Sequence, residues 1–191
     1  MKFTVIRFLK STFIRLRLHV LFAPLESFFI QLAYLSKLSK WVAKHTITDN
    51  DFVTKWDYNK RYNLYQSIFE KEYLHTAINY LEFGVADGYS FKWWLKKNTN
   101  PASKFYGFDT FTGLPEDFGP YKKGTFNSNN AVPDINDERG QFFQGLFQQT
   151  LPKFIQTFEA DKRLVLMLDA DLYSSTLFTL CTLAPYLKNG D

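Results

Sequence analysis

The stretch Leu81-Glu-Phe-Gly-Val-Ala-Asp-Gly-Tyr-Ser90 contains the change from strand to helix on which the predicted fold depends. Before it, Thr76 to Phe83 is a short run rich in β-forming residues, and after it Phe91 to Lys97 has the apolar spacing of a helix. The glycines between these runs predict a tight turn, because glycine adopts backbone conformations that other residues avoid. We therefore predict a strand, a glycine turn and the start of a helix.

The same alternation continues toward the carboxyl end of the chain. Strands are predicted at Lys104 to Phe108 and Arg163 to Leu168, and the region of Phe142 and Phe143 fits a strand or a short helix. Helices are predicted at about Lys60–Tyr73, Thr150–Glu159 and Thr176–Leu187, and Thr112 to Asn136 is mostly loop. Nearly continuous apolar strands alternating with helices are typical of a parallel α/β sheet with flanking helices.

Acidic residues lie at the ends of three predicted strands. Glu82 and Asp109 end the first two strands, and Asp169 and Asp171 follow the strongly apolar one. In a parallel sheet, ligands bind beyond the carboxyl ends of the strands. Carboxylates gathered there without partners would be costly to bury. We therefore predict a ligand site at this edge of the sheet.

The glycine spacing indicates which ligand the turn binds. Dinucleotide sites use Gly-x-Gly-x-x-Gly, whereas Gly84 and Gly88 are separated by three residues. This wider turn suits S-adenosylmethionine, with Glu82 toward the ammonium group and the amides near Gly88 and Ser90 toward the carboxylate. Asp109 is placed to accept both ribose hydroxyls. The alternatives are a dinucleotide site, which the spacing disfavours, and a turn that binds no ligand.

Four motifs resemble the macrocin O-methyltransferase family and occur in the expected order over residues 60–190. They are Leu81 to Ser90, Gly107-Phe-Asp-Thr-Phe-Thr-Gly-Leu-Pro-Glu116, Gly145-Leu-Phe-Gln-Gln-Thr-Leu-Pro152 and Leu168-Asp-Ala-Asp-Leu-Tyr-Ser-Ser-Thr176. The family includes sugar O-methyltransferases of antibiotic biosynthesis and relatives near surface-polysaccharide genes. The second and fourth motifs together are specific.

This resemblance implies a Rossmann-like class I methyltransferase fold, a magnesium ion and methyl transfer to a sugar or glycoside hydroxyl. Asp169 would be a metal ligand and the base, and Asp171 would share either role or support the turn. Gly145 would lie in the segment that passes the adenine. The remaining cofactor contacts would come from Glu82, Gly84, Gly88, Ser90 and Asp109. The alternative for Asp169 and Asp171 is a pair that caps the following helix.

The family normally continues after Leu187 into another strand and an adjacent pair of acids that completes the metal site. We therefore expect a truncated copy of a longer protein, or a second chain that supplies the rest. Two other functions stay open from the residues alone. One is a non-catalytic, methyltransferase-like binding protein, and the other is an NAD-dependent oxidoreductase, which the glycine spacing disfavours.

The first 44 residues differ in charge from the remainder. They contain eight basic residues and one acid, Glu26, for a net charge of +7, whereas the remainder carries −3. An acidic body argues against nucleic-acid binding. We predict a helical arm at residues 1–45, broken at Pro24, and a methyltransferase domain at 46–191. The arm either packs on the body or on a second subunit of a homo-oligomer, or anchors peripherally on an anionic membrane.

Cysteine usage indicates the compartment. The chain has a single cysteine, Cys181, which excludes an intrachain disulfide framework and a cysteine-rich zinc site. Its apolar surroundings in the sequence predict a small core residue. We expect a cytoplasmic protein, or one held at the inner face of the membrane.

Overall fold

The computed structural model describes residues 2–45 and 57–191. The chain divides into two compact units, Met1–Leu64 and Tyr65–Asp191. The predicted domain boundary between residues 45 and 46 falls at the edge of 46–56, outside the described residues.

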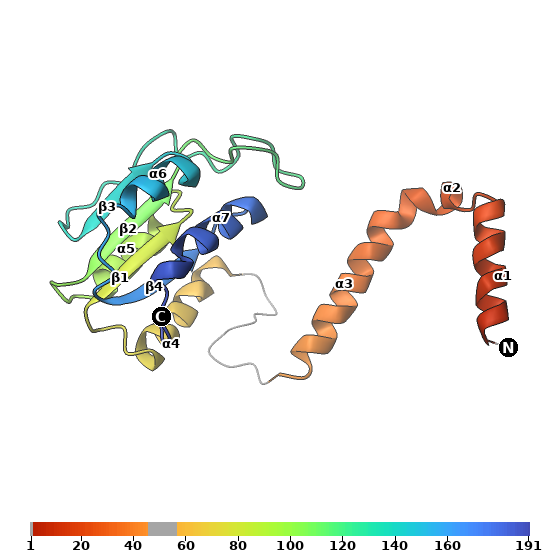
Figure 1. The fold of residues 1–191 in the computed structure, drawn as a ribbon, viewed down its shortest axis with the longest axis horizontal. Helices are drawn as coiled ribbons and strands as arrows, with labels where there is room; N and C mark the ends of the chain where they lie inside the picture. The colour runs from red at the N-terminus through yellow and green to blue at the C-terminus, as the bar shows by residue number, and fades with distance from the viewer. Residues whose placement is uncertain (1, 46–56) are drawn as a thin grey trace. The chain divides into compact units, whose positions relative to one another are not determined.

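The second unit is built on a parallel sheet of four strands in the order β3-β2-β1-β4 (Figure 1). The strands are β1 (Ile78–Phe83), β2 (Lys104–Asp109), β3 (Gly140–Gln144) and β4 (Arg163–Leu168). The predicted parallel α/β architecture is therefore confirmed. The ambiguous region at Phe142 and Phe143 is a strand, because it pairs with β2 along its whole length.

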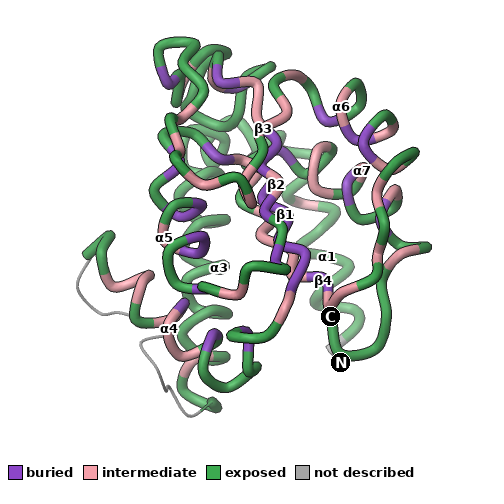
Figure 2. The backbone as a smooth tube through the Cα atoms, turned by 90° about the vertical axis from the view of Figure 1, so that its left-hand side faces the viewer, coloured by how far each residue is buried: buried purple, intermediate pink, exposed green. Residues whose placement is uncertain are grey.

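Helices cover both faces of this sheet. Successive side chains of each strand point to opposite faces, so the buried apolar residues of β1 and β2 need a packed layer on each side. On one face, Tyr80 of β1 and Phe105 of β2 contact the aromatic side chains of α5 (Tyr89–Lys97). On the other, Phe83 and Phe108 stack at 4.7 Å and pack against α6 (Phe147–Phe154) and α7 (Tyr173–Leu183). Figure 2 shows the buried backbone running along β1 and β2. Two aromatic cores thus fix the strands between the helices.

Two helices differ from their predicted bounds. α6 begins at Phe147 rather than Thr150, and Pro152 lies inside it. Its buried residues Phe147, Leu151 and Phe154 are spaced by four and three, so packing of this face outweighs the backbone cost of an internal proline. α7 begins at Tyr173 and ends at Leu183, and a 3-10 turn at Ala184–Tyr186 contains Pro185. Cys181 on α7 is exposed, so the expectation that it is a core residue is wrong. The predicted helix near Lys60–Tyr73 is α4 (Arg61–Lys71).

The arm within the first unit consists of α1 (Lys2–Arg15), α2 (His19–Phe22), a 3-10 turn (Ala23–Leu25) and α3 (Glu26–Val42). The same unit also includes a 3-10 turn at Tyr58–Lys60 and the first residues of α4. The helical nature of the arm is confirmed, but the position of its main break is not. A bend of 81° separates Phe3–Arg15 from His19–Val42, and Arg17 between them has a left-handed φ of 50°. Pro24 is accommodated in the 3-10 turn, where its missing N–H costs little.

No single helix among the described residues has the length and apolar character to cross a membrane. Only the bent pair Phe3–Arg15 and His19–Val42 meets both requirements, and only when the two are taken together.

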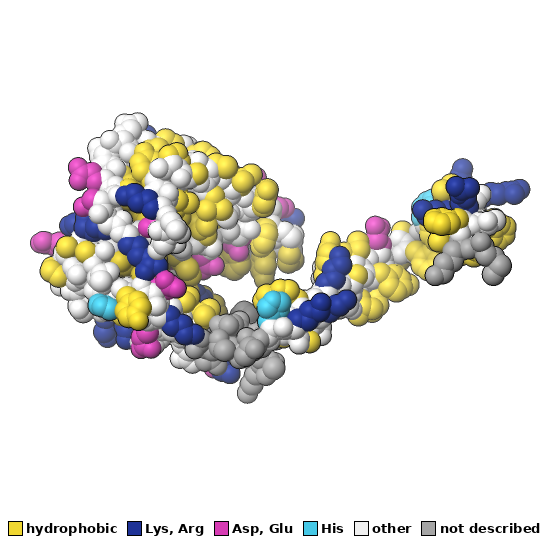
Figure 3. Space-filling model, turned by 60° about the horizontal axis from the view of Figure 1, so that its bottom comes forward, with side chains coloured by type: hydrophobic (Ala, Val, Ile, Leu, Met, Phe, Trp, Pro, Cys, Tyr) yellow, Lys and Arg dark blue, Asp and Glu magenta, His cyan; other side chains and the backbone are white. Residues whose placement is uncertain are grey.

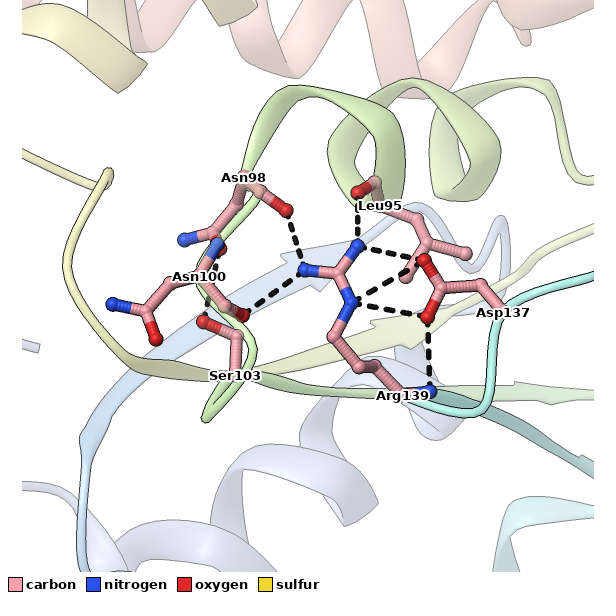
Figure 4. Close-up of polar contacts among 6 residues, drawn as sticks. All are labelled: Leu95, Asn98, Asn100, Ser103, Asp137 and Arg139. Carbon is pink, nitrogen blue, oxygen red and sulfur yellow. Dashed lines mark hydrogen bonds and ion pairs between the residues drawn. The ribbon is translucent and has the colours of Figure 1, made fainter.

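A polar cluster at the amino-terminal edge of the sheet fixes the end of α5 (Figure 4). The guanidinium of Arg139 donates to the carbonyls of Leu95, Asn98 and Asn100 at 2.8, 2.6 and 3.1 Å. It also forms an ion pair with Asp137 at 2.7 Å. Carbonyls at a helix end lack partners within the helix, and a cation there also complements the helix dipole.

Candidate functional site

The carboxyl ends of the strands are joined by backbone hydrogen bonds beyond the last paired residues. The N–H groups of Gly84, Asp169 and Gly145 donate to the carbonyls of Phe108, Phe83 and Asp109 at 3.0, 2.9 and 2.9 Å. Gly84 follows β1, Gly145 follows β3 and Asp169 follows β4. The residues predicted from separate motifs therefore lie along one edge of one sheet.

The turn after β1 requires its two glycines. Gly84 has a φ of +96°, and a Cβ atom there would lie 2.5 Å from the carbonyl oxygen of Asp169. Gly88 has a φ of +74° and precedes α5, and a Cβ there would lie 2.9 Å from Pro133. Both positions combine a conformation that disfavours side chains with a close neighbour. At Gly84 that neighbour is the turn carrying the acid pair.

Glu82 lies beneath this turn and is completely buried. Its carboxylate accepts hydrogen bonds from the hydroxyl of Tyr80, at 2.6 Å, and from the hydroxyl of Ser90 in the first turn of α5. Burial and the neighbouring charge of Glu82 raise the pKa of Tyr80 well above its usual value, so Tyr80 stays protonated and donates. The hydrogen bond from Ser90 links the strand to the start of the helix.

Tyr80 is a site residue that the sequence motifs did not identify. It precedes Glu82 by two residues on the same strand, and residues spaced by two point to the same face. That spacing was available in the sequence, because a buried carboxylate needs a donor and Tyr80 is placed to supply one.

Asp109 ends β2 and holds the turn after β1. Its Oδ2 accepts the N–H groups of Val85 and Ala86 at 2.7 and 2.9 Å. Its Oδ1 accepts a hydrogen bond from the N–H of Phe111 at 2.7 Å and a longer one, of 3.5 Å, from the hydroxyl of Thr110. A carboxylate has about four acceptor positions, so the weakly used one on Oδ1 is where a further donor can bind.

Asp169 and Asp171 lie in the turn between β4 and α7, and both are exposed. Loss of part of its hydration, and then the charge of Asp169, raise the pKa of Asp171 above its usual value. The interpretation of this pair as a helix cap is wrong. The N-cap of α7 is Leu172, and no side chain caps the helix.

The segment between β2 and β3 borders the glycine turn. As predicted, it has little regular structure, apart from a bridge between Phe118 and Tyr121. Its return path brings Pro133 against Gly88. Gly145 then follows β3. This is the residue for which the resemblance to the macrocin O-methyltransferase family implies a place beside the adenine.

The described residues supply only part of the ligand set that the predicted magnesium site needs. Within residues 2–45 and 57–191, no group of three or more histidine, cysteine, aspartate or glutamate side chains is arranged to hold a metal ion. Asp169 and Asp171 supply two hard carboxylate groups, and a Mg²⁺ ion is commonly bound by one or two carboxylates with water and substrate. The pair is therefore compatible with Mg²⁺ as a partial ligand set.

Two solved structures are similar to this chain. One is described as CalS11, a calicheamicin methyltransferase, and aligns at 20% identity with a TM-score of 0.56, covering 81% of this chain and 73% of that chain. The other is an apo structure of CalS11, described as a TDP-rhamnose 3′-O-methyltransferase of calicheamicin biosynthesis, with 22% identity, a TM-score of 0.47 and the same coverages. The first match supports the Rossmann-like methyltransferase fold. No curated protein sequence matches the chain.

A family model described as a methyltransferase domain matches residues 81–190, which begin in β1 and include every predicted site residue. This range covers more than half of the chain, and a methyltransferase domain implies S-adenosylmethionine as its cofactor. The chain belongs to this methyltransferase family.

Proposed function

We propose that this protein transfers the methyl group of S-adenosylmethionine to a hydroxyl of a sugar or glycoside, as in the macrocin O-methyltransferase family. The contact between the glycine turn and the acid pair carries the proposal, because Gly84 lies directly against the backbone of Asp169. A cofactor bound over the turn would hold its methyl group close to a carboxylate. The four sequence motifs and the fold shared with a calicheamicin methyltransferase support this assignment.

The methionine end of the cofactor would lie over the turn from Gly84 to Gly88. The negative charge of buried Glu82 favours the ammonium group above it, and its hydrogen bond to Ser90 fixes the first turn of α5. Free N–H groups at that helix start attract the cofactor carboxylate. Asp109 would accept a ribose hydroxyl through Oδ1 while Oδ2 holds the turn, and Gly145 would lie beside the adenine.

The acid pair would activate the acceptor. A sugar hydroxyl is a weak nucleophile until its proton is removed, and a carboxylate within hydrogen-bond reach can accept that proton. Asp169 would take it as the oxygen attacks the methyl carbon, the carbon–sulfur bond breaks and a neutral thioether leaves. Alignment of the oxygen with the carbon–sulfur bond supplies much of the rate. When bound by Asp169 and Asp171, a Mg²⁺ ion would lower the pKa of the acceptor hydroxyl.

Methyl transfer to a panel of nucleotide sugars and glycosides, followed by mass spectrometry, tests the proposal. We expect Asp169→Asn to lower the turnover by about a hundredfold while S-adenosylmethionine still binds. Glu159→Gln, which changes an exposed acid away from the site, is the matched control.

Transfer unaffected by Asp169→Asn would contradict the role of this carboxylate. Cofactor binding without transfer to any acceptor would instead favour the non-catalytic alternative. Loss of activity on chelation, restored by Mg²⁺, is the result expected if the acid pair holds the ion.

A further inference from the structure

Helix α1 has two unlike sides. Val5, Leu9 and Phe13 are spaced by four residues and form one stripe, and all three are exposed. Arg7 and Arg15 are spaced by eight and lie on the opposite side. The helix is therefore amphipathic, and its apolar stripe faces solvent.

Helix α3 repeats this arrangement over a longer stretch. Phe28, Leu32, Leu35 and Leu38 lie at helical spacing, and between 46% and 61% of each is exposed. The opposite side carries the two cations of the helix, Lys37 and Lys40. Figure 3 shows hydrophobic and cationic side chains together over these helices. The second helix thus offers the same pairing of surfaces as the first.

Charge distinguishes a second copy of the arm from an anionic lipid surface as the cover for these stripes. Residues 1–44 contain eight cations and one acid, Glu26. A second copy of the same arm would bring like charges together, whereas an anionic lipid surface attracts each cation and accepts the apolar stripes. Trp41 and Tyr34 on α3 are also exposed, and both residue types favour the boundary between lipid and water.

The helices suit lying on a membrane better than crossing it. α1 spans roughly 21 Å at 1.5 Å per residue, short of a hydrocarbon core of about 30 Å. The helical run His19–Val42 is longer, but no single helix among the described residues is both long and apolar enough to cross a bilayer. The bend of 81° separates the two helices, so they do not form one straight span. We propose that residues 2–45 bind peripherally to an anionic phospholipid bilayer, with the apolar stripes of α1 and α3 in the interface and the cations among the head groups.

Sedimentation of the full chain with vesicles tests this proposal. We expect binding to vesicles that contain phosphatidylglycerol, weak binding to phosphatidylcholine alone, and loss of binding at high salt. The variant Arg7→Gln/Lys10→Gln/Lys37→Gln/Lys40→Gln should lower the partition coefficient at least about a hundredfold, because each of the four cations near an anionic surface contributes about fivefold. The matched control, Lys96→Gln/Lys104→Gln/Lys123→Gln/Lys153→Gln, changes four exposed lysines of the second unit and should bind as the native chain does.

A second variant tests the apolar stripes. Val5→Ser/Leu9→Ser/Phe28→Ser/Leu35→Ser should also lose binding at low salt, although its charge is unchanged. Circular dichroism and binding of S-adenosylmethionine establish that each variant is folded, and activity on soluble acceptors should be unaffected. Failure of the proposed methyl transfer would therefore leave the membrane result interpretable.

Four outcomes would overturn the proposal. The first is the absence of binding to anionic vesicles, and the second is binding that does not depend on lipid charge or salt. The third is bound protein that alkaline carbonate does not extract, because such resistance indicates a membrane-spanning segment. The fourth is self-association in analytical ultracentrifugation that the serine variant abolishes, which would show that a second copy covers the stripes.

Discussion

Gly84 has no side chain, and this allows the glycine turn to lie directly against the turn that carries the acid pair. Its φ of +96° disfavours any residue with a Cβ, and that atom would also lie 2.5 Å from the carbonyl oxygen of Asp169. The glycine therefore sets how closely the turn approaches the proposed base, and a larger residue would force the two apart.

Comparison of two glycine-to-alanine variants separates the backbone strain at positive φ from the collision of the new Cβ with its neighbour. Gly84→Ala should lower the free energy of unfolding by about 2 kcal/mol or more and weaken S-adenosylmethionine binding, because strain and backbone collision add. Gly190→Ala is the matched control, since Gly190 has a φ of +98° with no atom within 4 Å of the added Cβ. Equal destabilisation of both variants in chemical denaturation would show that the contact with Asp169 contributes nothing.

Side-chain partners within the site could be predicted only in part. Glu82, Asp109 and Asp169 were placed at strand ends by counting residues, and the structure has them there. The hydrogen bonds of Asp109 to Val85 and Ala86 depend on how the turn after β1 folds back over β2, which no local pattern encodes. Their strength at 2.7 and 2.9 Å gives Asp109 a structural role alongside the proposed ribose contact.

At the scale of elements, Asp137 and Arg139 stabilise the junction of α5 and β3, at the end of the sheet opposite the site. Hydrogen bonds from Arg139 hold the pKa of Asp137 below its usual value. A depressed carboxyl pKa contributes stability above the pKa of the unfolded chain, about 3.9, and this stability is lost as the pH falls through the folded-state value.

Acid titration of thermal stability tests this junction. Asp137→Asn should lower the melting temperature at neutral pH, and the difference from the native chain should shrink below about pH 4, where the native carboxyl is protonated. Asp117→Asn is the control, because its ion pair with Lys122 is exposed and such pairs contribute little. A difference that persists at low pH would indicate that Asp137 acts through packing instead.

The strands were predicted more accurately than the helix bounds. β4 is a nearly uninterrupted apolar run, so Arg163–Leu168 was delimited by composition alone. α6 starts three residues before its predicted start, because its buried face outweighs the proline signal at Pro152. The bend in the arm lies at Arg17 rather than Pro24, and a left-handed arginine has no sequence signature.

At the scale of the whole molecule, the two units carry different chemistry. The second unit contains the sheet, the glycine turn and the acid pair, and it includes the whole of the methyltransferase match at residues 81–190. The first unit holds the excess positive charge and many of the exposed apolar side chains. Catalysis and membrane attachment are thus proposed for separate parts of the chain, and variants of one should spare the other.

Isothermal titration calorimetry of the full chain with S-adenosylmethionine, its demethylated product and NAD tests the proposed cofactor site. We predict that both S-adenosyl ligands bind and that NAD does not, since the spacing of Gly84 and Gly88 lacks the middle glycine of a pyrophosphate site. Asp109→Asn should weaken both S-adenosyl ligands by at least about tenfold, the cost of a lost charged hydrogen bond. Binding of NAD without binding of either S-adenosyl ligand would contradict the account.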